Sequence, residues 1–279
     1  MTDDLHIERK DRILQVSDLP TLPTALEEVS RLVEDPSSST DQIAKVIAYD
    51  QVLSAKILKM VNSPIYGFPG RIGSISHALV LLGFNVIKGV IVSTSVFDTM
   101  NKSMAGLWEH SVGCALACAE VAKTARLKDP EEYSVCGLLH DLGKVVAAVQ
   151  LPDLKTEIDR RVAEDDLTYR EAEQLVLGFD HERINAWLAD HWHLPLMIRE
   201  GMSRHHTPLR AQHFPAAACV VHVGDFLVRL FEYGSGGDDN VPELEPKALR
   251  LLKIGGAELE RTMDALSEKL IDVASVSFA

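Results

Sequence analysis

Apolar residues recur at intervals of three and four along most of the chain, which is the spacing of an amphipathic helix. In residues 40–61, for example, Ile43, Ile47, Ile57 and Val61 follow this pattern. No segment shows the strict alternation of apolar and polar residues between hairpin turns that marks a half-buried β-strand. The pattern therefore predicts an all-α protein.

The same spacing predicts where individual helices lie. Prolines and glycines interrupt it, and these residues mark helix ends because proline cannot continue a helix interior and glycine favours turns. The expected helices span residues 40–61, 108–126, 133–150, 168–177, 182–191, 195–204, 215–233 and 248–276. Residues 234–246 are rich in glycine and acidic residues and are expected to form an exposed loop.

Three parts follow from this organisation. Residues 1–103 are expected to form a helical N-terminal subdomain, residues 104–235 a helical core with most of the candidate chemistry, and residues 236–279 a loop and helix that cover this core. With 279 residues, 46% of them hydrophobic, the chain can bury a sizeable core without disulfide bonds.

Composition narrows the class of function. The chain has 28 basic and 41 acidic residues, and the resulting net charge of −13 repels nucleic-acid phosphates, so DNA binding is not expected. The first ten residues are charged where a secretory signal would be apolar. Residues 78–97 are apolar, but Asn85, Lys88 and two glycines interrupt them, so a pair of buried core helices is expected instead of a membrane span. The sequence thus predicts a soluble, cytoplasmic protein without a membrane partner.

The four cysteines give no indication of a metal or redox motif. They are Cys114, Cys118, Cys136 and Cys219, and no two of them form a CxxC pair. All four lie in apolar helical segments, so they are expected to be small buried side chains.

The sharpest candidate for chemistry is the segment at residues 138–144, in which Lys144 follows His140 and Asp141. On a helix over residues 133–150, the histidine and the aspartate would lie at one edge of the buried stripe, with the lysine between them in projection. An imidazole and a carboxylate beside apolar neighbours are costly to bury unless they are paired or bind a metal ion. The segment is therefore either part of a metal site or a polar pair on a solvated face.

Further imidazoles and carboxylates stand near helix ends. They are His110, His181, the adjacent pair His205 and His206, and Asp225. Each of them, taken alone, is more typical of a structural residue than of a ligand. Together with residues 140 and 141 they form an ordered series: His, His-Asp, His, His-His, Asp. His222 precedes Asp225 by three residues and is expected to be a core residue or to support a ligand.

This ordered series resembles the ligand set of the HD superfamily of metal-dependent phosphohydrolases, and the His-His pair resembles its two-metal members. The resemblance implies a helical N-terminal subdomain packed on an HD-type metal-binding domain. It implies that one ion is held by His110, His140 and Asp225, the other by His181, His205 and His206, and that Asp141 is shared. Asp141 and Lys144 are the implied catalytic residues.

Longer motifs are similar to the HDOD branch of this superfamily, and the likeness covers residues 18–233. They include residues 19–23, 62–67 and 75–83 in the N-terminal half. HDOD proteins are bacterial signalling modules to which a substrate is rarely assigned. The related HD-GYP branch cleaves cyclic dinucleotides and continues its His-His pair into Gly-Tyr-Pro, whereas this chain continues into Thr-Pro-Leu at residues 207–209.

Two functions fit this resemblance. In the first, the protein binds one or two divalent metal ions and transmits a signal through a protein partner. In the second, it is a metal-dependent phosphohydrolase, such as a phosphodiesterase of a nucleotide or cyclic dinucleotide, in which the ions acidify water and Lys144 neutralises charge on the phosphate. The first is favoured because the sequence shows no residues that would recognise a particular substrate. Imidazole and carboxylate ligands suit Fe, Mn, Zn or Ni, so the identity of the metal stays open.

Overall fold

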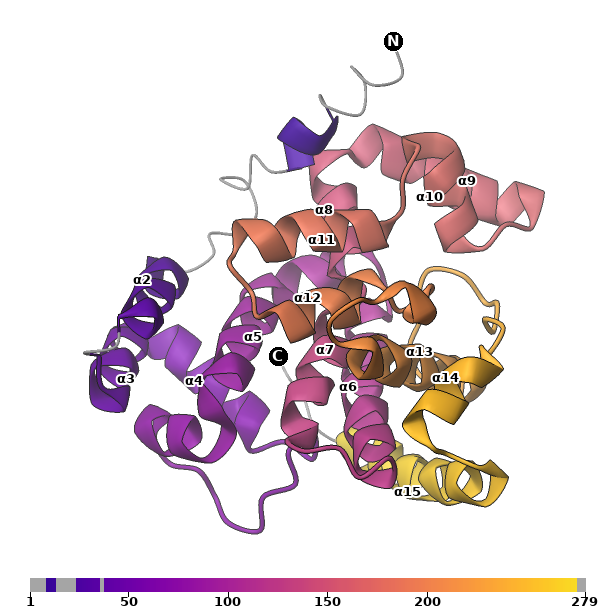
Figure 1. Cartoon of the computed structure of the whole chain (residues 1–279). Coiled ribbons are helices and arrows are strands. Elements are labelled where there is room, and N and C mark those ends of the chain that lie inside the picture. Colours follow the sequence, from indigo (N-terminus) through magenta and orange to yellow (C-terminus); the bar gives the residue numbers. More distant parts are fainter. Residues whose placement is uncertain (1–8, 14–23, 36–37, 275–279) are drawn as a thin grey trace.

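A computed structural model describes residues 9–13, 24–35 and 38–274, and this part of the chain is helical without strands (Figure 1). The prediction of an all-α protein is confirmed, whereas the motif at residues 19–23 lies outside the described residues. The elements are α2 (Thr24–Glu34), α3 (Thr40–Tyr49), α4 (Gln51–Val61), α5 (Ile75–Ser103), α6 (Leu107–Thr124), α7 (Pro130–Leu139), α8 (Leu142–Gln150), α9 (Pro152–Asp165), α10 (Tyr169–Leu177), α11 (His181–His191), α12 (Leu196–Ser203), the 3-10 turn η2 (Pro208–Arg210), α13 (Pro215–Leu230), α14 (Pro246–Leu252) and α15 (Gly256–Ala274).

Some predicted helices are divided in the structure. Residues 40–61 form α3 and α4, which meet at Asp50, and the Asp50 side chain caps α4 by accepting a hydrogen bond of 2.9 Å from Leu53 N. The C-terminal helix is likewise divided into α14 and α15, with Lys253 in the left-handed region at φ 57°. Helix α9 was not predicted, because its apolar stripe is narrow: Leu154, Ile158 and Val162 stand among charged residues, and Ile158 alone of the three is fully buried.

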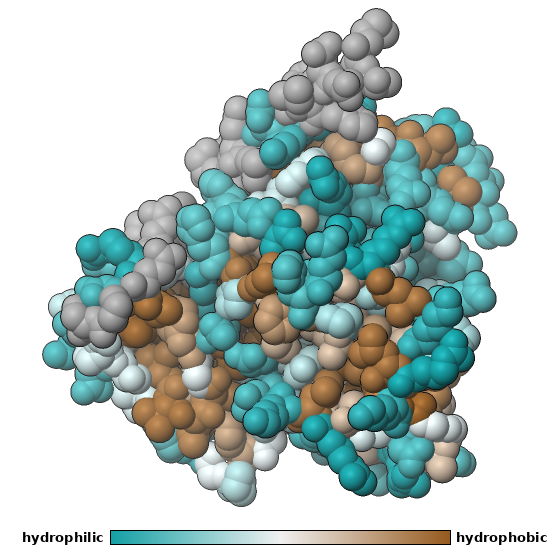
Figure 2. Space-filling model, viewed as in Figure 1, coloured by the Kyte–Doolittle hydropathy of each residue, from teal (hydrophilic) through white to brown (hydrophobic). Residues whose placement is uncertain are grey.

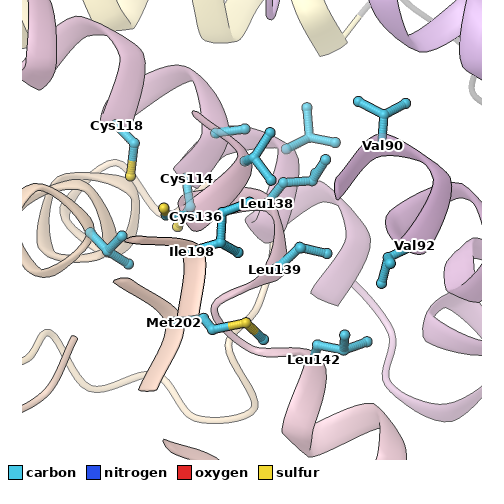
Figure 3. Close-up of a cluster of buried hydrophobic side chains, with 14 of the residues drawn as sticks. Val90, Val92, Cys114, Cys118, Cys136, Leu138, Leu139, Leu142, Ile198 and Met202 are labelled. Atoms are coloured by element: carbon cyan, nitrogen blue, oxygen red, sulfur yellow. The ribbon is translucent and has the colours of Figure 1, made fainter. Parts of the chain in front are cut away.

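Helix α6 lies at the centre of the core and packs against α7, α13 and α15 (Figure 1). Small residues allow this close packing: a Cβ added at Gly113 would lie 2.7 Å from the Tyr233 ring. Figure 3 shows part of this core, in which Cys114 and Cys118 lie with Leu138 among buried side chains. The prediction that the cysteines are buried is confirmed for all four.

Helix α5 connects the N-terminal helices to the rest of the protein, since it packs against α3 and α4 and also against α7 and α8. Its segment Ile75–Val96 is long and apolar enough to cross a membrane. The segment Pro130–Gln150, which contains α7 and α8, meets the same criterion only together with α9, and the two are bent by 119° relative to each other. Most of the α5 segment is buried inside the protein, and Gly83 (φ 75°, ψ 171°) breaks it. These are the features of the predicted core helices.

One hydrophobic core runs from Ile13 to Val273 across the N-terminal and C-terminal helices. Because this core is continuous, it does not mark the expected boundaries at residues 103 and 235, and the division into three parts stays a prediction.

The loop between α13 and α14 is less exposed than the sequence suggested. Gly236 is buried, and Gly237, at φ +103°, lies so close to Tyr169 that an added Cβ would be 2.6 Å from its ring. Tyr169 N also donates a hydrogen bond of 2.8 Å to Asp238 Oδ2. The expectation of an exposed loop was wrong for this stretch, because glycines that permit turns also permit close packing against α10.

Candidate metal centre

The chain leaves its helical path at Asp141, directly after His140 and between α7 and α8. The single helix predicted over residues 133–150 is thus wrong at Asp141, which has φ −101° and ψ 9°, whereas His140 keeps helical angles as the last residue before the break. Asn185, buried on α11, stabilises this break: its Oδ1 accepts from Gly143 N at 2.7 Å, and its Nδ2 donates to the carbonyls of His140 and Met202. The helix break turns both side chains towards the centre of the protein.

The first cluster joins side chains from α6, the helix break and α13. His110 Nε2 lies 3.1 Å from Asp225 Oδ1 and 3.3 Å from His140 Nε2. Cys114, one helical turn after His110, places its Sγ 3.6 Å from His110 Nε2, and the four ligand atoms lie within 4.8 Å of one another. The structure therefore brings together the three residues predicted for one ion and adds a thiol that was not predicted.

The second cluster contains the other three histidines of the predicted ligand set. His181 begins α11, and His205 and His206 follow α12. His181 Nε2 lies 3.3 Å from His205 Nε2 and 3.0 Å from His206 Nε2. Neutral imidazole has one N–H and one lone pair, so three converging nitrogens cannot all be satisfied by one another. Such a cluster suits a shared positive ion.

Asp141 lies between the two clusters, and its oxygens face different histidines. Oδ2 is 3.3 Å from His140 Nε2 and 3.7 Å from His110 Nε2, whereas Oδ1 is 3.4 Å from His181 Nε2. The side chain is 1% exposed, and Oδ1 has no hydrogen-bond partner within the described part of the chain. An unpartnered buried carboxylate oxygen costs free energy that a bound cation would remove. The residues present therefore fit a divalent metal ion.

The outer nitrogens of these rings are held in place. His140 Nδ1 lies 2.8 Å from Gly137 O, and His205 Nδ1 lies 3.1 Å from Met202 O. His181 Nδ1 lies 2.5 Å from Glu173 Oε2. A ring that donates from Nδ1 keeps the lone pair of its Nε2 directed at the centre, as in histidines that bind metals.

Burial determines the charge of the histidines in the second cluster. It lowers the pKa of His181 and His206 well below 6.5 and that of His205 to about 3, so these rings are neutral at pH 7, the form that binds metal. Burial raises the pKa of Asp141, but the neighbouring His140 and Lys144 outweigh this and hold that pKa well below its ordinary value. The second cluster thus contains neutral imidazoles, and the carboxylate between the two clusters is ionised.

Two cations adjoin the carboxylates. Lys144 is 1% exposed, and its Nζ donates hydrogen bonds of 2.7 Å to Asp141 Oδ2 and 2.8 Å to Gly236 O. Arg229 donates from Nε to Asp225 Oδ1 at 3.1 Å and from Nη1 to Asp238 Oδ1 at 3.0 Å. The role predicted for Lys144 on a substrate phosphate stays a prediction.

Several of these residues were absent from the sequence-based set. Cys114 and Arg229 each stand four residues after a predicted ligand, a spacing that places them on the same helix face and could have identified them. Glu173 and Asp238 reach the centre from other segments, so no local spacing indicates them. His222 is placed as expected for a supporting residue, because its Nδ1 lies 2.8 Å from His205 O and its Nε2 accepts from Glu245 N at 2.9 Å.

A cavity of about 640 Å³ adjoins the second cluster, a volume within the usual range for small-molecule sites. His181, His206 and Lys144 line it, but no residue of the first cluster does. The wall also contains Arg170, Arg210, Arg229 and part of the loop from Asp238 to Pro246. The cavity gives a ligand access to one of the two clusters.

Comparison with protein families identifies the family: the sequence model of the HDOD domain matches residues 19–208. The match covers more than half of the chain, so the chain belongs to the HDOD family. Of the predicted ligands, Asp225 lies beyond the matched residues, and the others lie within them.

Solved structures show the same fold. An HDOD domain protein of unknown function from Geobacter sulfurreducens has a TM-score of 0.74 and 23% identity, covering 99% of each chain. A protein from Shewanella amazonensis SB2B, provisionally described as a phosphohydrolase, has a TM-score of 0.67 and 23% identity, covering 94% of this chain and 96% of that one. A protein from Marinobacter aquaeolei VT8, provisionally described as a signal transduction protein, has a TM-score of 0.72 and 17% identity, covering 99% of this chain and 67% of that one.

Curated relatives are longer than this chain. An uncharacterized protein of Treponema pallidum (strain Nichols) is 25% identical over 259 residues, which are 89% of this chain and 48% of that protein. The uncharacterized protein YuxH of Bacillus subtilis (strain 168) is 29% identical over 153 residues, which are 51% of this chain and 37% of that protein. The chain thus spans half or less of the length of the curated relatives that it matches.

Proposed function

We propose that this HDOD protein binds two divalent metal ions, one in each cluster, and hydrolyses a phosphate ester that enters the adjoining cavity. One observation carries the proposal: the unpartnered, buried Asp141 Oδ1 faces His181, and His181 also lines the cavity. The sequence favoured a signalling role because it showed no residues for substrate recognition. The cavity supplies candidates for that recognition.

A divalent ion in this centre supplies Lewis acidity, because it polarises a phosphoryl oxygen and lowers the pKa of water. The residues of the chain supply position and charge. His181 and His206 bring the second cluster to the cavity, and the buried Lys144 adds a positive charge beside Asp141. Arg210 is exposed on the cavity wall, where its guanidinium can donate paired hydrogen bonds to a phosphate.

The cavity also indicates the size and charge of the substrate. Its volume suits a nucleotide-sized molecule, including the cyclic dinucleotide considered above. Acidic residues of the wall, such as Glu171, Asp238 and Glu243, partly balance its arginines. We therefore expect a substrate with few phosphate groups, since these carboxylates would repel a highly charged polyphosphate.

Hydrolysis is tested with untagged protein loaded with Mn(II), or with Fe(II) in the absence of oxygen. The substrates are p-nitrophenyl phosphate, bis-p-nitrophenyl phosphate, nucleotides and cyclic dinucleotides. We expect turnover that His206→Ala abolishes and that His213→Ala, which alters an exposed histidine outside the clusters, leaves unchanged. Metal-loaded protein without turnover, or equal turnover in both variants, would contradict the proposal.

A second function, signalling through a protein partner, is favoured by the surface of the N-terminal helices. Val52 on α4 is 68% exposed and Val80 on α5 is 73% exposed. Figure 2 shows apolar side chains gathered over these helices. Such a surface suits protein contact. Partner capture that Val52→Asp abolishes and His206→Ala preserves would support this function over hydrolysis.

We also propose a cytoplasmic location, in line with the predicted soluble protein. The four cysteines are all unpaired, although secreted proteins usually oxidise theirs. Cell fractionation with an antibody against the protein tests this location, and recovery from the membrane or the culture medium would contradict it.

A further inference from the structure

The first cluster contains a thiol, whereas the second consists of histidines. Cys114 is 0% exposed, and its Sγ lies 3.6 Å from His110 Nε2. Two other cysteines have different surroundings: Cys118 Sγ lies 3.8 Å from Val220 O, and Cys136 Sγ lies 3.4 Å from the carbonyl of Glu132. Cys114 therefore differs from them in facing nitrogen and carboxylate donors.

We propose that Cys114 is a ligand of the ion in the first cluster, so that the two metal subsites differ in chemistry. The first, which we call the thiolate subsite, consists of His110, Cys114, His140 and Asp225. The second, the histidine subsite, consists of His181, His205 and His206. Asp141 faces both. This inference rests on the proposed two-metal centre and adds to it a ligand and a difference in metal preference.

Two distances from His110 in the thiolate subsite match those expected between ligands of a tetrahedral ion. With metal bonds of about 2.0–2.1 Å to imidazole nitrogen and about 2.3 Å to sulfur, tetrahedral ligands lie about 3.3 Å apart for two nitrogens and about 3.6 Å apart for nitrogen and sulfur. His110 Nε2 lies 3.3 Å from His140 Nε2 and 3.6 Å from Cys114 Sγ. Asp225 Oδ1 lies 3.1 Å from His110 Nε2, close to the tetrahedral value, and 3.8 Å from His140 Nε2, which is longer.

The packing of α6 against α7 brings the thiol to this position. Gly137 on α7 lies so close to α6 that an added Cβ would be 2.5 Å from Cys114 O. The carbonyl of the same glycine lies 2.8 Å from His140 Nδ1 and so orients that ring. One close contact between helices therefore sets both the thiol and a neighbouring histidine.

The two subsites also differ in access. The residues of the thiolate subsite are at most 2% exposed, and none of them lines the cavity. His181 and His206 of the histidine subsite do line it. Metal sites whose coordination positions are all filled by protein side chains are typically structural, whereas catalytic sites keep a position for water or substrate. We therefore expect the thiolate subsite to retain its ion and to prefer Zn, Co or Fe over Mn or Mg.

The test is a cobalt(II) titration of the full chain after removal of metal by a chelator. Thiolate ligation to cobalt(II) produces a sulfur-to-cobalt charge-transfer band in the near ultraviolet, and imidazole or carboxylate ligation does not. We expect the band in the wild type, its loss in Cys114→Ala, and at least about tenfold weaker binding of one cobalt ion in that variant. Cys118→Ala is the matched control, because Cys118 is equally buried one turn later on the same helix.

The outcomes separate this inference from the proposed function. Two cobalt ions bound without the band would overturn the thiolate ligand but not the two-metal centre, and failure to bind cobalt would overturn both. The band without hydrolysis of any phosphate ester would overturn the proposed function alone. Should Cys114→Ala fail to fold, X-ray absorption at the cobalt edge of the wild type decides the question, since we expect a sulfur neighbour at about 2.3 Å. A first shell of nitrogen and oxygen alone would overturn the inference.

Discussion

Glu173 tests whether the histidine subsite is built to hold an ion. This residue is 0% exposed, and its Oε2 lies 2.5 Å from His181 Nδ1 and accepts from His181 N at 2.9 Å. Because Nδ1 is engaged in this way, the lone pair of Nε2 is directed at the other two histidines and Asp141. The account therefore predicts that Glu173 controls metal affinity at one subsite and not at the other.

The size of the effect follows from what each substitution removes. Loss of a carboxylate behind a metal-binding histidine typically lowers affinity about 10–100-fold, or about 1.4–2.8 kcal/mol. Burial raises the pKa of Glu173, so the acceptor atom matters more than the charge. We expect about tenfold weaker binding of the second ion in Glu173→Gln and about 100-fold in Glu173→Ala. The alanine variant should also lose about 1–3 kcal/mol of stability, because the His181 N–H is left without its acceptor.

Isothermal titration of chelator-stripped protein with zinc(II) measures both binding events. Glu164→Gln, which changes a glutamate on the surface of α9, serves as the control and should bind like the wild type. If Glu173→Ala weakened both ions equally, or neither, the assignment of His181 to a separate subsite would be refuted.

Three further predictions concern stability. Asn185→Ala should lower the free energy of unfolding by about 3 kcal/mol, because three buried hydrogen bonds of about 1 kcal/mol each are lost, and a loss below about 1 kcal/mol in urea denaturation would contradict its role at the helix break. Burial lowers the folded-state pKa of His205 to about 3, below its unfolded value near 6.5, so this residue stabilises the metal-free protein above pH 6.5 and that stability is lost as the pH falls. In urea denaturation at pH 7.5, 6.5 and 5.5, the free energy of unfolding should fall because of this residue by up to about 1.4 kcal/mol per pH unit as the pH decreases. The free energy of unfolding of His205→Asn should depend less on pH. An equal pH dependence in the wild type and the variant would contradict a buried neutral ring. Zinc(II) at 100 times its dissociation constant should raise the free energy of unfolding by about 2.7 kcal/mol, and Asp141→Ala should lack this increase. A melting temperature that changes with neither zinc nor chelator would contradict the metal site.

The ordered series of histidines and aspartates, through its resemblance to the HD ligand set, selected residues that the structure brings together. Local spacing was less informative about backbone geometry. The apolar stripe through residues 133–150 predicted one helix, but the Asn185 side chain, 42 residues beyond Gly143, stabilises a break there. Propensity and periodicity contain no term for such a distant contact.

The residues that surround the predicted ligands could be recognised from the sequence to different degrees. Cys114 and Arg229 could have been selected by helical spacing from His110 and Asp225, but the apolar setting of the first favoured the interpretation as a buried side chain. Glu173 approaches the centre because the turn between α10 and α11 brings it to His181, the first residue of α11. Asp238 approaches it because a glycine-containing loop folds back against Tyr169 and Arg229. Contacts of this kind depend on tertiary structure, so a single sequence does not indicate them.

Anomalous X-ray diffraction at a metal absorption edge, on crystals of untagged protein supplied with zinc(II), tests the central claim most directly. The account predicts two separate peaks, one beside His110, His140 and Asp225 and one beside His181, His205 and His206, with Asp141 between them. Absence of any peak at these residues, or peaks confined to surface sites, would contradict it.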